Sequence, residues 1–188
     1  TNYDKNEKEI VGGKNGFGFK LVLIWSTWGQ IETIDSKTGQ KYIQTFKNNL
    51  DIIEEPIISK TKEKPYTCVR FKPDFQRLGI EGLNDDFKDL MMRRIYDIAA
   101  VTGKNVKVKF NGDVVPIKSF EQYVNMYIGE KSETKRIFEK INDRWEVGIL
   151  YLPDNGYDQI SYVNCISTYK GGNHVKYVEG EILKKIEE

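Results

Sequence analysis

A glycine-dense segment that runs directly into an apolar helical pattern is the feature that most constrains this chain. Gly12, Gly13, Gly16 and Gly18 place four glycines within seven residues, and the apolar run Leu21–Trp25 follows closely. Glycine lets successive backbone N–H groups converge, because no Cβ blocks positive φ or close approach. A helix N-terminus behind such a loop adds about half a positive charge and free N–H donors, so phosphate is the ligand that it favours. The segment predicts a phosphate loop, with an ordinary flexible turn as the open alternative.

The order of the glycines excludes two other phosphate sites. A Walker loop needs Ser or Thr after Gly-Lys, whereas Asn15 follows Gly13-Lys14 in this chain. A dinucleotide fingerprint reads G-x-G-x-x-G after a strand, whereas this loop reads G-x-x-G-x-G after the polar run Asp4–Glu9. The loop therefore belongs to neither class.

Composition limits the broad class of protein. The chain has 188 residues, of which 39% are apolar and 12% aromatic, as expected of one or two small globular domains. No apolar run approaches the roughly 18 residues needed to span a bilayer, so no membrane partner is expected. The 29 Lys and Arg against 28 Asp and Glu give a net charge of +1. A dedicated duplex-DNA binder would carry a strong basic excess, so this chain is not expected to hold nucleic acid strongly by itself.

The cysteines and the two ends of the chain give further expectations. Cys68 and Cys165 each stand in a β-patterned segment, and two buried thiols in a reducing compartment are expected. The sequence opens at Thr1 without Met or a targeting segment and closes inside a helical pattern at Glu188. We expect it to be the middle of a longer protein.

Hydrophobic periodicity and turn residues predict an ordered series of elements. Helices are expected over 16–26, over 83–101, from the N-cap Ser119 to Tyr127, and over Val175–Glu188. Strands are expected at Ile31–Ile34, Lys41–Phe46, Tyr66–Phe71, Val106–Phe110, Val114–Ile117, Lys135–Ile141, Arg144–Leu152 and Gln159–Thr168. Asn111-Gly112 predicts a type I′ hairpin turn. The pattern changes near 118–130 from mixed helices and strands to a strand meander, so a boundary is expected there and the fold class is α+β.

Catalytic and metal-binding constellations do not assemble from the residue types present. The single histidine, His174, stands at a strand-to-helix junction, where helix capping is favoured over catalysis. No His or Cys spacing indicates zinc, and no carboxylate spacing singles out an acid–base pair. Asp85-Asp86 after Asn84 is interpreted as the acidic first turn of a helix, and Arg93-Arg94 as a solvated polar face rather than a phosphate contact. No catalytic residue and no metal ligand is therefore predicted.

Two distant segments, taken together, resemble one family. Asn2–Asp4 followed by Gly12–Leu21 resembles the lid and phosphate loop of eukaryotic-type type IIA DNA topoisomerases, which usually read Ser-Asn-Tyr-Asp and Gly-Gly-Arg-Asn-Gly-Tyr-Gly-Ala-Lys-Leu. Gln159–Val178 resembles the transducer signature of the same family. Further blocks match in the expected order at Tyr66–Asp74, Met92–Asp97 and Asn142–Val147. The resemblance covers essentially the whole chain.

The resemblance implies a fold, an activity and partners. Residues 1–118 would be the later half of a GHKL-type (Bergerat) ATPase sandwich, and residues 119–188 the first part of a β-rich transducer domain with a C-terminal helix. In this family, ATP binding closes a dimeric clamp that drives one duplex through a transient double-strand break in another. ATP and Mg²⁺ are thus implied as cofactors, and duplex DNA and a second subunit as partners. The implied location is the nucleus, or the viral factory in the cytoplasm for a large DNA virus.

The same resemblance implies a nucleotide-binding set. Thr1 and Asn2 would lie by the nucleotide sugar, and Lys20 would give a charged donor near the phosphates. The phosphates would be wrapped, mainly by backbone N–H groups, by Gly13, Lys14, Asn15, Gly16, Phe17, Gly18 and Phe19.

Three loop positions depart from the usual family residues. Lys14 stands where Arg is usual, so a bidentate contact would become a single-point one. Phe17 replaces Tyr and loses a hydroxyl, and Phe19 replaces a small Ala, which changes the packing behind the loop.

Other family residues are implied to lie outside the sequence. The general-base Glu and the magnesium-binding Asn would belong to a helix before Thr1, and the phosphate-sensing Gln-Thr-Lys loop would lie beyond Glu188. The DNA-cleaving Tyr and its metal-binding carboxylates would also lie beyond Glu188. This chain alone is therefore predicted not to hydrolyse ATP.

Two other functions stay open beside the topoisomerase fragment. The first alternative is a non-catalytic GHKL-like nucleotide-binding scaffold that has kept the loop without the turnover. The second is another GHKL ATPase, such as a mismatch-repair or chaperone ATPase. The block Lys170–His174 argues against the second, because its resemblance is to topoisomerase transducers.

Overall fold

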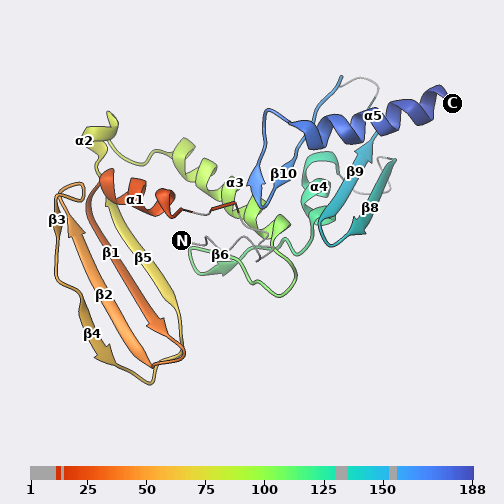
Figure 1. Cartoon of the computed structure of the whole chain (residues 1–188). Coiled ribbons are helices and arrows are strands. Elements are labelled where there is room, and N and C mark those ends of the chain that lie inside the picture. Colours follow the sequence, from red (N-terminus) through yellow and green to blue (C-terminus); the bar gives the residue numbers. More distant parts are fainter. Residues whose placement is uncertain (1–11, 14, 130–134, 153–155) are drawn as a thin grey trace. The chain divides into compact units, whose positions relative to one another are not determined.

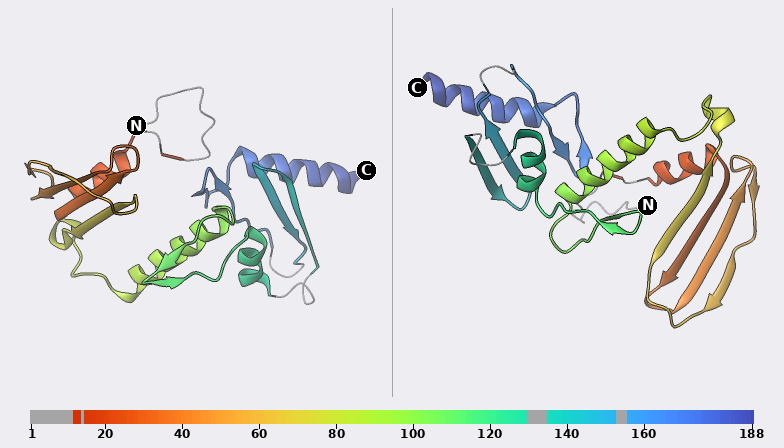
Figure 2. Two further views of the ribbon diagram at one scale, coloured as in Figure 1. Left: turned by 90° about the horizontal axis from the view of Figure 1, so that it is seen from below. Right: turned by 180° about the vertical axis from the view of Figure 1, so that it is seen from behind.

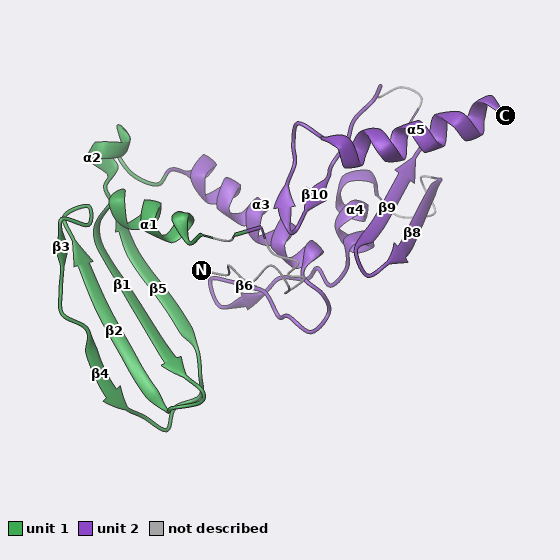
Figure 3. Cartoon of the chain, in the orientation of Figure 1, with its two compact units in different colours: residues 1–7, 13–83 green, residues 8–12, 84–188 purple. Residues whose placement is uncertain are grey.

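A computed structural model of the chain describes residues 12–13, 15–129, 135–152 and 156–188 (Figure 1). These residues form two compact units, divided between Leu83 and Asn84 (Figure 3). The site predictions on Thr1, Asn2 and Lys14 lie outside the described residues. The ATPase–transducer boundary expected at 118/119 is a functional division, which the two units do not test, and it stays a prediction.

The first unit is built on an antiparallel sheet. Its elements are α1 (Phe17–Ile24), β1 (Ser26–Asp35), β2 (Gln40–Lys47), β3 (Ile52–Ile53), β4 (Ile57–Lys60), β5 (Thr67–Pro73) and α2 (Phe75–Leu78). The strand order is β3-β2-β1-β5, and β4 also pairs with β2. Figures 1 and 2 show β1 in the middle of the long strands and α1 against one face of the sheet.

The turn between β1 and β2 follows from its sequence. Asp35 accepts hydrogen bonds from the backbone N–H of Lys37 at 3.0 Å and from the Thr38 hydroxyl at 2.7 Å. Gly39 takes a φ of 62°, which glycine adopts without a Cβ penalty. The predicted hairpin is confirmed, and its strands pair in register from Asp35↔Gln40 to Trp28↔Lys47.

Helix α1 rests on the sheet through one close approach. Leu23 is the buried residue of α1, with 3% of its surface exposed. A Cβ built on Gly29 of β1 would overlap the Leu23 side chain. The glycine therefore sets how near the helix can come to the strand.

The second unit alternates helices with short hairpins. Its elements are α3 (Asp85–Val101), β6 (Lys109–Phe110), β7 (Asp113–Val114), α4 (Phe120–Ile128), β8 (Arg136–Asn142), β9 (Trp145–Leu150), β10 (Tyr162–Val163), β11 (Ile166–Ser167) and α5 (Asn173–Glu187). The pairs β6–β7, β8–β9 and β10–β11 are separate two-stranded sheets in the part of the chain that the structure describes. Together with the sheet of the first unit, these elements confirm the α+β class.

Two helix starts in this unit, those of α3 and α4, are the ones that the sequence predicts. Asn84 caps α3 by accepting from the Phe87 N–H at 3.0 Å, and Asp85-Asp86 form its acidic first turn. Ser119 caps α4 by accepting from the Gln122 N–H at 3.2 Å. Both caps satisfy N–H donors that the helix itself leaves free.

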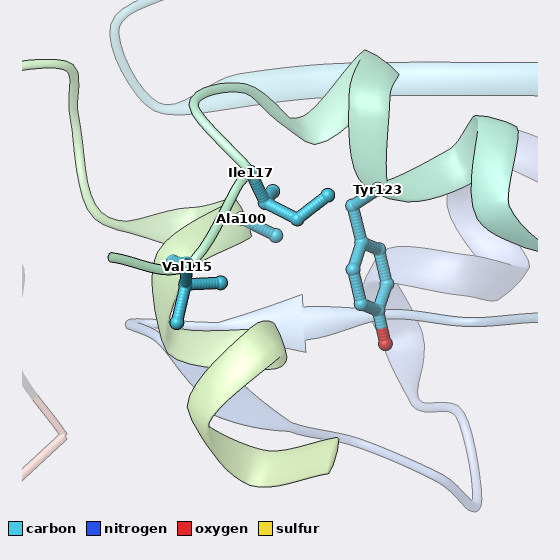
Figure 4. Close-up of a cluster of buried hydrophobic side chains, with 5 residues drawn as sticks. Ala100, Val115, Ile117 and Tyr123 are labelled. Carbon is cyan, nitrogen blue, oxygen red and sulfur yellow. The ribbon is translucent and has the colours of Figure 1, made fainter. Parts of the chain in front are cut away.

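A small apolar core lies where α3, the β6–β7 hairpin and α4 meet. Figure 4 shows the side chains of Ala100, Val115, Ile117 and Tyr123 directed toward one another. They are buried, as is Ala99, and Tyr162 of β10 packs against the cluster.

One predicted strand and one segment without a predicted strand differ in the structure. Gln159–Thr168 is not one strand but a tight hairpin, because Asn164 and Cys165 take positive φ angles of 48° and 65° and reverse the chain. Between Pro56 and Pro65, where the sequence predicts no strand, β4 pairs with β2. Such pairing depends on a partner strand that local sequence does not reveal.

His174 and the cysteines also differ from expectation. The N-cap of α5 is Gly172, and His174 instead lies 3.1 Å from the Thr168 hydroxyl through Nε2. Cys68 and Cys165 are free thiols that are half-buried rather than buried. In the described ranges, no helix is long and apolar enough to cross a membrane.

Candidate phosphate-binding site

The glycine loop ends where α1 begins. Gly16 stands at the N-cap in the left-handed conformation, with φ 67° and ψ 15°, and gives no side-chain cap. The first helical hydrogen bond runs from the Lys20 N–H to the Gly16 carbonyl at 3.4 Å. The N–H groups of Phe17, Gly18 and Phe19 thus have no acceptor within the helix.

Among the described residues, the surroundings of these donors are open. Cβ atoms built on Gly13, Gly16 and Gly18 would meet no atom within 4 Å. No acidic residue stands in the first turn of α1. The free N–H groups and the helix dipole therefore face space that an anion can enter, which is the arrangement that phosphate requires.

The aromatic residues of the loop have separate roles. Phe17 is 63% exposed, and the Lys20 ammonium lies 5.8 Å from the centre of its ring. Phe19 instead packs edge-on against Phe46 of β2, with ring centres 6.3 Å apart. The large side chain at position 19 is therefore accommodated by the sheet behind the loop.

The C-terminal end of α1 is held by side chains from elsewhere in the first unit. The Ile24 carbonyl accepts from Asn49 Nδ2 at 3.0 Å and from Arg77 Nη1 at 3.2 Å. The Arg77 guanidinium also lies 4.9 Å from the centre of the Trp25 ring. A cation at this end of a helix is stabilised by the helix dipole. These contacts fix the helix while its N-terminal end stays open.

Asp74 joins the two anchors to each other. Its carboxylate accepts from the Arg77 N–H at 3.0 Å, as the N-cap of α2, and from Asn49 Nδ2 at 3.1 Å. These hydrogen bonds hold the pKa of Asp74 below its usual value, and the bond from the backbone N–H of Arg77 contributes most. The spacing from Asp74 to Arg77 is a helix-start signal that the sequence offered, whereas nothing local pointed to Asn49.

A network of charges lies on the face of the sheet opposite α1, because Gly29 and Glu32 of β1 point to opposite faces. The Glu32 carboxylate pairs with Lys41 at 2.8 Å and with Arg70 at 2.7 Å, and it accepts from the Tyr66 hydroxyl. These bonds, led by that from Lys41, lower the pKa of Glu32 to about 2. The network stabilises the sheet and stands apart from the loop.

The loop residues that the structure describes lie together on one short stretch: Gly13, Asn15, Gly16, Phe17, Gly18, Phe19 and Lys20. All are exposed except Phe19, which is half-buried. Among the residues described, no three His, Cys, Asp or Glu side chains come together in a way that could hold a metal ion.

Two curated proteins similar to this chain are both named DNA topoisomerase 2. The chain is 46% identical to DNA topoisomerase 2 of Arabidopsis thaliana, over 99% of this chain and 13% of that protein. It is 44% identical to DNA topoisomerase 2 of Acanthamoeba polyphaga mimivirus, over 97% of this chain and 15% of that protein. The chain thus spans only a small part of these relatives. No family model matches it.

Solved structures agree with the sequence comparison. The ATPase region of Saccharomyces cerevisiae topoisomerase II matches with a TM-score of 0.90 and 42% identity, over 100% of this chain and 49% of that one. The ATPase and transducer domains of DNA topoisomerase II from Balamuthia mandrillaris match with a TM-score of 0.89 and 36% identity, over 99% of this chain and 47% of that one. The chain therefore belongs to the DNA topoisomerase 2 family and corresponds to part of its ATPase and transducer region.

Proposed function

We propose that the chain binds ATP through its glycine loop and forms part of an ATP-gated dimeric clamp that acts on duplex DNA. The observation that carries the proposal is the open N-terminus of α1, where three N–H groups lack an acceptor within the helix and the first turn contains no acidic residue. The relatives are named for a topoisomerase activity, and the solved neighbours for an ATPase region.

Each residue has a defined role in this proposal. The backbone of Gly13, Lys14, Asn15, Gly16, Phe17, Gly18 and Phe19 holds the polyphosphate, with Lys20 as a charged donor and Thr1 and Asn2 at the sugar. Binding of ATP at this loop would close the clamp. Residues 1–118 make the ATPase part, and residues 119–188 make the transducer part that relays nucleotide state.

Magnesium would accompany the bound triphosphate. By the family resemblance, its protein ligand would be an Asn outside residues 1–188. The full protein would act in the nucleus, or in a viral factory if its source is a large DNA virus. Its homodimer would bring two such regions together.

A pair of glycine variants tests the nucleotide site. Gly16 and Gly79 have φ angles of 67° and 70°, and neither has an atom within 4 Å of a built Cβ. Gly16→Val and Gly79→Val therefore impose the same backbone strain, but only the first puts a side chain into the loop. We expect Gly16→Val to remove most binding of a non-hydrolysable ATP analogue, titrated with and without the preceding segment, and Gly79→Val to keep it. Equal affinity in the two variants would refute the assignment.

A further inference from the structure

The second unit contains a hollow lined by two arginines, and these residues are distant from the glycine loop in the sequence. A hollow of about 400 Å³ is lined by Leu90, Arg93, Arg94 and Asp97 of α3, by Ile166 and Ser167 of β11, and by Tyr169. Figures 1 and 2 show α3 beside the β10–β11 hairpin. The two arginines that the sequence alone assigned to a solvated face thus stand in the wall of a cavity.

Arg94 is oriented by a buried carboxylate. Its Nη1 donates to Asp97 Oδ2 at 2.7 Å, and the side chain of Asp97 is only 4% exposed whereas that of Arg94 is 41% exposed. The other oxygen of Asp97 accepts from the hydroxyls of Tyr123 at 2.5 Å and Tyr162 at 3.0 Å. Both oxygens of Asp97 are therefore hydrogen-bonded by residues of the second unit. The ion pair with Asp97 fixes Arg94, which also lines the hollow.

Arg93 and Ser167 add donors that the described part of the chain does not use. Neither side chain makes a hydrogen bond or ion pair with another described residue. Ser167 lies directly opposite Tyr162 in the hairpin, so its hydroxyl shares the face that is tied to α3. Two guanidinium groups and a hydroxyl therefore converge on one space, a donor set that matches the oxygens of a phosphate group.

Tyr169, an aromatic residue that lines the hollow, is followed in the chain by a third cation, Lys170. Tyr169 and Lys170 are the central residues of a turn closed by the Gly171 N–H to the Thr168 carbonyl at 2.7 Å. Tyr169 is 78% exposed, and the Lys170 ammonium lies 5.8 Å from the centre of its ring. Hydrogen bonds of the Thr168 hydroxyl with Ser161 at 2.5 Å and with His174 at 3.1 Å hold this turn in place.

We propose that Arg93, Arg94 and Ser167 hold a backbone phosphodiester of duplex DNA, with Lys170 on the adjoining phosphate. Arg93 is exposed and Tyr169 is 78% exposed, so the hollow opens to solvent and leaves room for a ligand that continues beyond it. A nucleic-acid backbone does so and presents its charges in a row. This inference rests on the proposed function, because it assigns a contact to the DNA on which the clamp acts. One such patch on a chain of net charge +1 gives weak binding.

Duplex binding by the whole chain tests the site. A labelled duplex oligonucleotide is titrated by fluorescence anisotropy at several low salt concentrations, with Arg93→Ala and with Lys88→Ala as the control. Lys88 lies on the same helix, outside the hollow, with its side chain 62% exposed and paired to Asp85. Both variants remove one positive charge from α3, one inside the lining of the hollow and one outside it. Arg94 is left intact because its loss would leave Asp97 without its ion pair.

We expect Arg93→Ala to weaken duplex binding about tenfold and to reduce the slope of log affinity against log salt by about 1. Ser167→Ala should weaken it severalfold without changing the slope, and Lys88→Ala should change affinity less than twofold. Equal losses in Arg93→Ala and Lys88→Ala, or no measurable duplex binding at low salt by the unmodified chain, would overturn the proposal.

Two further titrations distinguish a free phosphate or nucleotide from DNA. Inorganic phosphate and the non-hydrolysable ATP analogue are each titrated into the unmodified chain and into Arg93→Ala. We expect Arg93→Ala to bind both as the unmodified chain does. If Arg93→Ala loses phosphate or analogue binding while duplex binding is unchanged, the hollow holds a small anion and the proposal is wrong. Failure of the glycine loop to bind the analogue would refute the nucleotide site and leave the duplex result intact.

Discussion

At the residue scale, glycines that look alike in the sequence have different reasons to be glycine. Gly16 takes a left-handed φ and faces open space, whereas Gly29 lies in a strand and makes room for Leu23. A side chain at position 16 would strain the backbone conformation, whereas a side chain at position 29 would overlap a neighbouring side chain. Substitutions should separate the two reasons.

Gly29→Ala should destabilise the first unit by about 1–3 kcal/mol, because its methyl group would overlap Leu23 in a packed contact. Urea unfolding followed by tryptophan fluorescence measures the change. Gly82→Ala is the control, since a Cβ at Gly82 meets nothing within 4 Å. If both variants unfold at the same urea concentration, the close approach of α1 to β1 is not a constraint.

Glu32 should control the acid stability of the first unit. Its pKa is lowered from 4.5 to about 2 by Lys41, Tyr66 and Arg70, so the folded state binds this proton less readily than the unfolded chain. The resulting stability is complete above about pH 4.5 and is lost as the pH falls toward 2. Glu32→Gln should lower stability at neutral pH and flatten its decline over this pH interval, as measured by urea unfolding at a series of pH values.

The matched control for this prediction is Glu63→Gln. Glu63 also pairs with Lys41, but at 3.5 Å and with its side chain 56% exposed. Its removal should leave the pH dependence nearly as it is. A Glu32→Gln variant with an unchanged acid transition would contradict the role of the network.

At the scale of elements, α1 is anchored at one end and open at the other. Arg77 is exposed, yet it bonds the Ile24 carbonyl and stacks on Trp25. Arg77→Ala should therefore speed hydrogen exchange of the last amides of α1, whereas Gln76→Ala, a neighbouring exposed residue, should not. Unchanged exchange in Arg77→Ala would mean that the helix end is held by Asn49 alone.

The β10–β11 hairpin is tied to α3 and α4 by hydroxyl groups around Asp97. The pKa of Tyr162 is raised to about 12, and burial of its hydroxyl is the main cause. The folded state then keeps this proton while the unfolded chain loses it from about pH 10, so stability falls as the pH rises from 10 toward 12. Tyr162→Phe should cost about 1–2 kcal/mol at neutral pH by leaving Asp97 with one hydroxyl donor fewer.

Thermal unfolding at neutral and alkaline pH measures both effects. Tyr127→Phe is the control, because the Tyr127 hydroxyl contacts Tyr123 rather than Asp97. The Tyr162→Phe variant should also lose part of the alkaline decline in stability. A variant as stable as the unmodified chain would show that the hydroxyl is not needed to hold the hairpin.

At the scale of the whole molecule, the chain should bind nucleotide without turning it over. The resemblance puts the general base before Thr1, and no catalytic residue is predicted among residues 1–188. Steady-state phosphate release by the purified chain should equal the background. Turnover that is abolished by a change within residues 13–20 would show that this expectation is wrong.

Much of the fold could be predicted from the sequence, because many of its turns and helix caps depend on residues that are close together in the chain. The turn at Asp35–Gly39, the caps Asn84 and Ser119 and the Asn111-Gly112 turn all have their partners within a few residues, so their signals are readable along the chain. Gln159–Thr168 was misjudged because an alternating pattern does not reveal a reversal at Asn164-Cys165. The helical part of the site was predictable, whereas its anchors were not.

The sequence by itself determined the family, through the resemblance of several ordered segments, and the α+β class. It also determined the place of the glycine loop at a helix start, because glycine spacing acts over a few positions. Only the tertiary structure decided that Asn49 and Arg77 hold the end of α1, that Gly29 makes room for Leu23, and that Tyr162 reaches Asp97. Each of those contacts joins segments far apart in sequence. Packing and hydrogen-bond geometry select such partners in three dimensions, and no periodicity along the chain specifies them.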